Sequence, residues 1–148
     1  MPRIDYAQVA PGAVKALYGL HAYSEKGAIE QKLSLLVVLR VSQINGCGFC
    51  VDMHTQELRK IGENQQRIDC LVAWSETDLY TPREQAAFKL AESMTLVSQT
   101  HVPDEVFDAA QTEFTDKELV DLAMTVVEIN AWNRMAITFR RYPAHRDS

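Results

Sequence analysis

Apolar residues recur along most of the chain at the spacing of an α-helix. Within residues 12–26 they lie three or four positions apart, as one face of a helix requires, and Gly27 follows as a C-cap. Residues 30–44 are apolar on nearly every side, which predicts a helix buried on most of its faces. A buried strand over residues 35–41 is the alternative, because a short apolar run fits either structure by its periodicity.

Start and stop signals predict the helices that follow. Thr81 and Thr115 each stand three residues before a glutamate, which is the pattern of a capping box. Pro103 is followed by two acidic residues, and negative charge suits the positive end of a helix dipole. The remaining predicted helices cover residues 47–61, 64–74, 81–98, a stretch beginning at 103, 115–129 and 131–140. Since no segment alternates with the period of a strand, the predicted fold class is all-α.

Two segments resemble each other at a fixed distance along the chain. The dipeptide Ile44-Asn45 recurs at residues 129–130, an offset of 85 residues (129 − 44). In each copy an apolar helix is expected to break at asparagine plus a small residue, where the asparagine caps a second helix. We therefore expect one domain over residues 1–148, a helical bundle built from a repeated helical hairpin at about 30–62 and about 115–140.

Composition narrows the range of functions. The chain has 148 residues, of which 47% are hydrophobic and 24% charged, values typical of a single globular domain. Its 15 basic against 20 acidic residues give a net charge of −5, so a nucleic-acid partner is not expected. The longest apolar run, Leu35–Leu39, is far shorter than the roughly 20 residues of a membrane span, and the first residues do not fit a secretory signal. These features predict a cytoplasmic domain without a membrane partner.

Three cysteines carry the most chemistry. Cys47 and Cys50 form a Cys-x-x-Cys motif, which in a reducing compartment indicates redox or metal chemistry rather than a structural disulfide. On a helix that advances about 100° per residue, both lie on one stripe with His54, one turn beyond Cys50. Helix starts and nearby imidazoles favour the nucleophilic thiolate. His54 is therefore a candidate general base, and the second cysteine would convert a sulfenic acid into a disulfide.

Two other interpretations of the motif stay open at this point. Zinc would find three ligands here, and either Cys70 or His101 would have to fold beside them to complete the usual four. In the other interpretation, both cysteines of the motif are inert core residues. Cys70 is itself expected to be a core residue, because its neighbours in the sequence are apolar. The favoured interpretation is a redox pair with no metal and no other cofactor.

The residues around the motif resemble a known family. The stretch SQINGCGFCVDMH at 42–54 and the later INAWNR at 129–134 are similar to the AhpD-like alkylhydroperoxidases, in the carboxymuconolactone decarboxylase superfamily. The resemblance implies an all-helical homo-oligomer, a dimer, trimer or hexamer, that acts as a thiol peroxidase on hydroperoxides. It also implies a dithiol reductant such as a lipoyl group. By the same resemblance Cys50 is the peroxidatic thiol, Cys47 its resolving partner and His54 part of a proton relay.

One position departs from the family pattern. Members with the complete relay carry a glutamate in the preceding helix, where this chain has Leu35, and leucine accepts no proton. Glu128, beside the second Ile-Asn, is the candidate to replace it if the repeat brings Glu128 near His54. Two hypotheses follow. The first is a thiol peroxidase or dithiol–disulfide oxidoreductase, and the second is a redox-sensing or scaffold oligomer that kept the fold with weakened chemistry.

Overall fold

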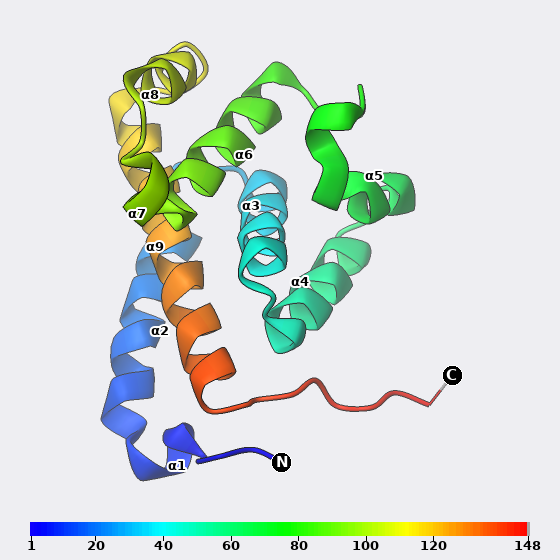
Figure 1. The fold of residues 1–148 in the computed structure, drawn as a ribbon, viewed down its shortest axis with the longest axis vertical. Coiled ribbons are helices and arrows are strands. Elements are labelled where there is room, and N and C mark those ends of the chain that lie inside the picture. The colour runs from blue at the N-terminus through cyan, green and yellow to red at the C-terminus, as the bar shows by residue number, and fades with distance from the viewer. Residues whose placement is uncertain (148) are drawn as a thin grey trace.

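Helices are the only regular elements in residues 1–147, the part of the chain that the computed structural model describes (Figure 1). In chain order they are α1 (Tyr6–Val9), α2 (Pro11–Glu25), α3 (Gln31–Asn45), α4 (Gly48–Lys60), α5 (Gln65–Cys70), the 3₁₀ helix η1 (Leu71–Glu76), α6 (Pro82–Thr95), α7 (Val97–Thr100), α8 (Asp104–Gln111) and α9 (Asp116–Thr138). The predicted all-α class is confirmed, and residues 35–41 are helical rather than a strand. Of the helices described, none is both long and apolar enough to cross a membrane.

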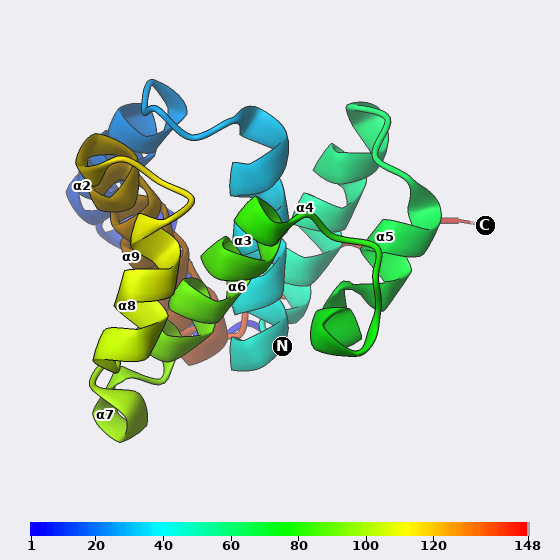
Figure 2. The same ribbon diagram turned by 90° about the horizontal axis from the view of Figure 1, so that it is seen from above.

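Helix α3 lies at the centre of the bundle. It packs against α9 on one side, against α4 on the other and against α6, an arrangement that Figure 2 shows from above. Its side chains Leu36, Val37, Leu39 and Val41 are at most 1% exposed. The sequence of α3 is apolar on most sides because the helix is enclosed on most sides, as predicted.

Local signals define most helix ends as expected. Thr81 and Thr115 both form complete capping boxes, each with the glutamate three residues later. Gly46 ends α3 in the left-handed conformation, with φ of 68°, where a Cβ is disfavoured. Two helices are shorter than predicted: the one over 81–98 stops at Thr95, and the one over 64–74 continues after Cys70 as η1. The four-residue α1 has no counterpart among the predicted elements.

The second predicted hairpin has no break. Helix α9 is one uninterrupted helix, so the predicted helix end near Ile129 and new start at Ala131 are wrong. Ala131 stands where the first copy has Gly46, and alanine favours a helix whereas glycine ends one here. Asn130 also satisfies its side chain within the helix, because its Nδ2 donates to the Val126 carbonyl at 2.9 Å.

The two Ile-Asn dipeptides meet where α3 packs against α9. Asn45 Nδ2 donates to Asn130 Oδ1 at 3.0 Å, so positions that are equivalent under the 85-residue offset contact each other. This contact is the arrangement that two related halves of a domain would make across their common boundary. The duplication itself stays a prediction.

After α9 the chain runs back beside α4 without regular structure, as the red tail of Figure 1 shows. The guanidinium of Arg141 lies over the ring of Phe49, 4.1 Å from its centroid. Further on, Arg146 forms an ion pair with Asp52, with Nη1 3.0 Å from Oδ2. The tail is thus attached to the first turns of α4, where the two cysteines of the motif lie.

Candidate redox site

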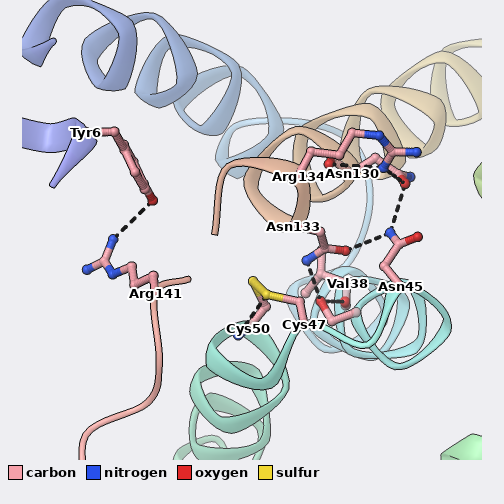
Figure 3. The surroundings of a disulfide bond; sticks show 10 residues. Tyr6, Val38, Asn45, Cys47, Cys50, Asn130, Asn133, Arg134 and Arg141 are labelled. Carbon is pink, nitrogen blue, oxygen red and sulfur yellow. Dashed lines mark hydrogen bonds between the residues drawn. A yellow bond between two sulfur atoms is a disulfide. The ribbon is translucent and has the colours of Figure 1, made fainter. Parts of the chain in front are cut away.

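Cys47 and Cys50 lie where α3 gives way to α4, and they are joined by a disulfide (Figure 3). Cys47 is the N-cap of α4 and Cys50 lies in its first turn, with the two Cα atoms 5.3 Å apart. Both residues are buried, with 1% and 2% of their surface exposed. The structure therefore brings the predicted pair together and shields it from solvent.

The two sulfurs differ in their surroundings. The backbone N–H of Cys50 donates to Cys47 Sγ at 3.3 Å, so Cys47 takes the capping role that serine or aspartate usually fills. The positive end of the α4 dipole lies at the same sulfur. When the disulfide is reduced, both effects stabilise negative charge on Cys47. Cys50 instead lies one turn before His54 on the same face of α4.

His54 is buried and is held by a carboxylate of its own helix. Its Nδ1 lies 2.8 Å from Glu57 Oε2, and this hydrogen bond is the main reason that the pKa of Glu57 lies below its usual 4.5. An ionised Glu57 only accepts, so in the neutral ring Nδ1 carries the hydrogen and Nε2 carries the lone pair. Nε2 is buried and has no hydrogen-bond partner within residues 1–147. Such a nitrogen is positioned to accept a proton from a group placed beside it.

The carboxylate predicted to support His54 has another partner. Glu128 on α9 is buried, and its Oε1 lies 2.7 Å from Nδ1 of His21 on α2. Its part in a relay stays a prediction, since Glu57 occupies the Nδ1 side of His54. Leu35 lies half-buried against the hydrophobic core. Glu57 is not among the residues predicted for the site, although its spacing of three residues from His54 on one helix is the signal that indicates such a contact.

A polar network ties α9 to α3 beside the disulfide (Figure 3). Asn133 has no exposed surface; its Nδ2 donates to Ser42 Oγ at 3.1 Å, and its Oδ1 accepts from Asn45 Nδ2 at 2.9 Å. Ser42 Oγ in turn donates to the carbonyl of Val38 at 2.7 Å. Because these buried polar groups satisfy one another, the network fixes how the two helices meet next to Cys47.

A pocket of about 280 Å³ opens between the first turn of α4 and the end of α9. Of the two cysteines in the motif, Cys47 is the one that lines it. A larger cavity, of about 590 Å³, lies elsewhere and is lined mostly by charged residues that pair with each other, such as Glu63 with Arg67. The smaller pocket is therefore the one that leads to the disulfide.

Cys70 takes no part in the disulfide, and the described residues provide no cluster of metal ligands. Cys70, at the end of α5, is a free and half-buried thiol. Within residues 1–147, no three side chains of the types His, Cys, Asp and Glu are placed to hold a metal ion together. In the disulfide state, moreover, Cys47 and Cys50 offer no thiolate ligand.

The sequence is similar to that of a known protein family and to that of a relative of nearly equal length. The carboxymuconolactone decarboxylase family matches residues 11–93, a range that contains Cys47, Cys50 and His54. An uncharacterized protein of Bacillus subtilis (strain 168), YdfG, is 42% identical over 135 residues, which cover 91% of this chain and 92% of that protein. The similarity is therefore not confined to the cysteine motif.

Two solved structures share the fold. A protein of unknown function from Agrobacterium tumefaciens, linked in its description to the antioxidant defence protein AhpD, has a TM-score of 0.96 and 36% identity, covering 99% of this chain and 100% of that one. The AhpD core of an uncharacterized peroxidase-related protein from Ralstonia eutropha JMP134 has a TM-score of 0.82 and 25% identity, covering 93% and 74% of the two chains. Nearly the whole helical arrangement is thus common to these proteins.

Proposed function

Because the chain belongs to the carboxymuconolactone decarboxylase family and shares its fold with AhpD-like proteins, we propose that it is a thiol peroxidase that reduces hydroperoxides with Cys47 and Cys50. One observation carries the proposal. A buried disulfide lies at the start of α4, one turn from a histidine whose Nε2 has a lone pair and no partner in the described residues. These are the parts that a dithiol reaction with a general base requires.

The reaction begins from the reduced pair. His54 Nε2 takes the proton of the Cys50 thiol, and the thiolate attacks the terminal oxygen of the hydroperoxide. The O–O bond breaks, Cys50 becomes a sulfenic acid, and the leaving alkoxide takes the proton back from His54 as an alcohol. Glu57 is a positioning residue in this scheme, since it holds the ring in the tautomer that accepts at Nε2.

The second half of the cycle forms and then reduces the disulfide. Cys47, whose thiolate is favoured by its N-cap position, attacks the Cys50 sulfur, and the disulfide forms as water leaves. A dithiol such as a lipoyl group then returns both cysteines to thiols and leaves as its own disulfide. The proposed partners are accordingly a hydroperoxide and a dithiol reductant, and no cofactor is needed.

The proposed setting is the cytoplasm, where reductants keep such pairs in turnover. The proposed assembly is a homo-oligomer, a dimer, trimer or hexamer. Neither proposal enters the chemistry of the cysteines, and the assembly is tested by its own measurement of molecular mass.

The test is turnover of an organic hydroperoxide with dihydrolipoamide as the reductant. The wild type is expected to consume hydroperoxide, and Cys50→Ser is expected to consume none, because the attacking thiol is gone. Cys70→Ser is the matched control and should keep wild-type activity, since Cys70 is a separate free thiol. Turnover that survives Cys50→Ser would contradict the proposed mechanism.

The redox-sensing alternative rests on Leu35, which stands where the complete family relay has a glutamate. Leu35→Glu separates the two functions. One outcome is that the wild type forms the disulfide with peroxide but does not consume hydroperoxide catalytically, whereas Leu35→Glu does. The chain is then a redox sensor with weakened peroxidase chemistry. If the wild type consumes hydroperoxide catalytically and Leu35→Glu does not raise the rate, the peroxidase proposal is supported. Glu57 is then sufficient to position His54.

A further inference from the structure

The C-terminal tail, residues 141–147, forms part of the wall of the pocket that leads to the disulfide (Figure 1). Arg141 and Tyr142 of the tail line this pocket together with Cys47 and Phe49. Cys47 has only 1% of its surface exposed, although it lines the same pocket. A reagent that reaches the disulfide through this pocket therefore passes beside the tail.

Few contacts hold the tail in place. None of its residues is buried, and the backbone of residues 142–147 forms no hydrogen bond with the backbone of another described residue. The chain just before the tail is fixed more firmly. The ring of Phe139 packs against that of the buried Tyr6, with centroids 5.4 Å apart, and its carbonyl accepts from the Arg3 N–H at 3.0 Å. A segment with so few buried contacts opens at a lower free-energy cost than the core beneath it.

Two side chains attach the tail to α4, at positions on either side of Cys50 in the sequence. The Arg141 guanidinium lies 4.1 Å from the centroid of the Phe49 ring. Near the end of the tail, Arg146 donates from both Nη atoms to the two carboxylate oxygens of Asp52. The Arg146 side chain is 54% exposed, so dissolved salt screens this ion pair. The tail is thus held at two points on the turns of α4 that carry the disulfide, and one of the two is sensitive to ionic strength.

We propose that the tail is an autoinhibitory cover of the disulfide. While Arg141 and Arg146 hold it on α4, the tail restricts access to Cys47 through the pocket. When these contacts break, the tail moves away from α4 and small reagents reach Cys47 faster. Conditions that weaken the ion pair, such as high ionic strength, therefore raise the reactivity of the disulfide. The cover acts on the cysteine pair whichever reaction the pair performs, so it does not depend on the proposed peroxidase activity.

The first test measures how fast the disulfide of the oxidised protein is reduced. Tris(hydroxypropyl)phosphine is the reductant, because it is uncharged and is neither attracted nor repelled by the charges that the variants remove. The thiols formed are blocked with iodoacetamide and counted by mass spectrometry. Arg146→Gln is expected to be reduced about threefold faster than the wild type, as the loss of an exposed ion pair predicts. Arg59→Gln, which removes the same charge from the exposed end of α4, should react as the wild type does. Equal rates for Arg146→Gln and the wild type would overturn the proposal.

Variants of Asp52 distinguish release of the tail from a change within α4. Asp52→Asn should accelerate reduction by the same factor as Arg146→Gln, because each variant removes one partner of the same ion pair. The variant that carries both substitutions should be no faster than either one alone. If the two factors multiply instead, the effect of Asp52 comes from its charge near the start of α4 and not from the tail, and the proposal fails.

The two attachments should contribute independently. Arg141→Gln removes the cation from the Phe49 ring and is expected to accelerate reduction about threefold. Combined with Arg146→Gln, it should give about a ninefold acceleration, because the two contacts are separate and a tail that leaves α4 loses both. A double variant no faster than Arg146→Gln alone would contradict a cover held at both points.

The second test changes only the salt concentration. Raising potassium chloride from about 0.01 M to about 1 M shortens the Debye length from about 30 Å to about 3 Å. The reduction rate of the wild type should rise about threefold, toward that of Arg146→Gln, whose own rate should change little. The same salt effect in both proteins would overturn the ionic attachment of the tail. Hydroperoxide turnover is measured separately, and its absence would leave the cover intact while refuting the peroxidase proposal.

Discussion

The proposed mechanism needs a histidine that accepts a proton at Nε2, which requires the tautomer with its hydrogen on Nδ1. In this chain the carboxylate that favours this tautomer of His54 is on the same helix. Cys50, His54 and Glu57 follow one another along one face of α4, at spacings of four and three residues. A relay built within one helix keeps its geometry when neighbouring helices shift, whereas a glutamate at position 35 would depend on how α3 meets α4. Leu35 therefore does not by itself leave His54 without support.

Glu57→Gln is expected to slow hydroperoxide turnover at least about tenfold, because a neutral amide no longer selects the tautomer with its lone pair at Nε2. The pH–rate profile should also change, which loss of packing alone would not produce. Glu76→Gln, an exposed glutamate in η1, is the matched control and should behave as the wild type. Identical rates for Glu57→Gln and the wild type at every pH would exclude the positioning role.

At the scale of helices, α2 depends on polar contacts more than on burial. No residue of α2, all of which the structure describes, is buried. Asp121 on α9 accepts from Tyr23 Oη and from the Ala28 N–H, both at 2.8 Å, and from Lys117 Nζ at 2.6 Å. Gly27, predicted as a C-cap, makes room for this carboxylate instead, since a Cβ there would lie 3.3 Å from Asp121 Oδ2.

Asp121→Asn tests this attachment through its pH dependence. Hydrogen bonds from Lys117 and then from the Ala28 backbone lower the pKa of Asp121 from 3.8 to about 2. The stabilisation is therefore complete above the unfolded value of 3.8 and is lost as the pH falls through about 2. At pH 7 the variant is expected to lose about 1–3 kcal/mol of unfolding free energy.

Urea unfolding of the wild type and the variant at neutral and at acidic pH checks this expectation. The difference between them should shrink as the pH falls from 3.8 toward 2. Asp108→Asn, an exposed substitution on α8, should change stability by no more than about 0.5 kcal/mol. A loss that is the same at both pH values would show that charge on Asp121 is not what holds α2.

The contact between α3 and α9 yields a separate prediction. Asn133→Ala removes a fully buried amide and leaves Ser42 Oγ without its donor, so about 1–3 kcal/mol of unfolding free energy should be lost. Reduction of the Cys47–Cys50 disulfide by a thiol should also become faster, because the network lies beside it (Figure 3). Thermal unfolding and a thiol-release assay measure the two effects, and an unchanged melting temperature would contradict the first.

Elements whose signals are local were predictable from the sequence, and contacts between distant segments were not. Cys47, Cys50 and His54 lie within eight residues of one helix start, so the helical period alone places them together. The partner of Glu128 depends on how α2 folds against α9, about which local periodicity says nothing. The predicted break in α9 is wrong because Asn-Ala is not equivalent to Asn-Gly, since only glycine readily takes the left-handed turn.

At the scale of the whole molecule, apolar side chains remain on the outside of the layer that α2 and α9 form. Tyr18 is 59% exposed, Val120 is 57% exposed and Val127 is 45% exposed. The two valines lie two turns apart on one face of α9. A homo-oligomer, as proposed, would cover such side chains on contact with a second copy.

Light scattering after size-exclusion chromatography checks the assembly. The mass is expected to be a multiple of 16.7 kDa that corresponds to two, three or six chains. Val127→Asp should reduce that mass, because a charge would then be buried without a partner in the interface. A wild-type mass of 16.7 kDa at micromolar concentration would contradict the oligomer.

The wall of the pocket beside Cys47 is completed late in synthesis. Arg140 is added 90 residues after Cys50 (140 − 50), which at 5–20 residues per second takes roughly 5–18 s. During that interval a nascent chain carries both thiols without Asn133, Ile137 or the tail beside them. Newly made chains are therefore the population in which irreversible sulfinic acid should accumulate during oxidant exposure, whereas mature molecules keep the pair enclosed.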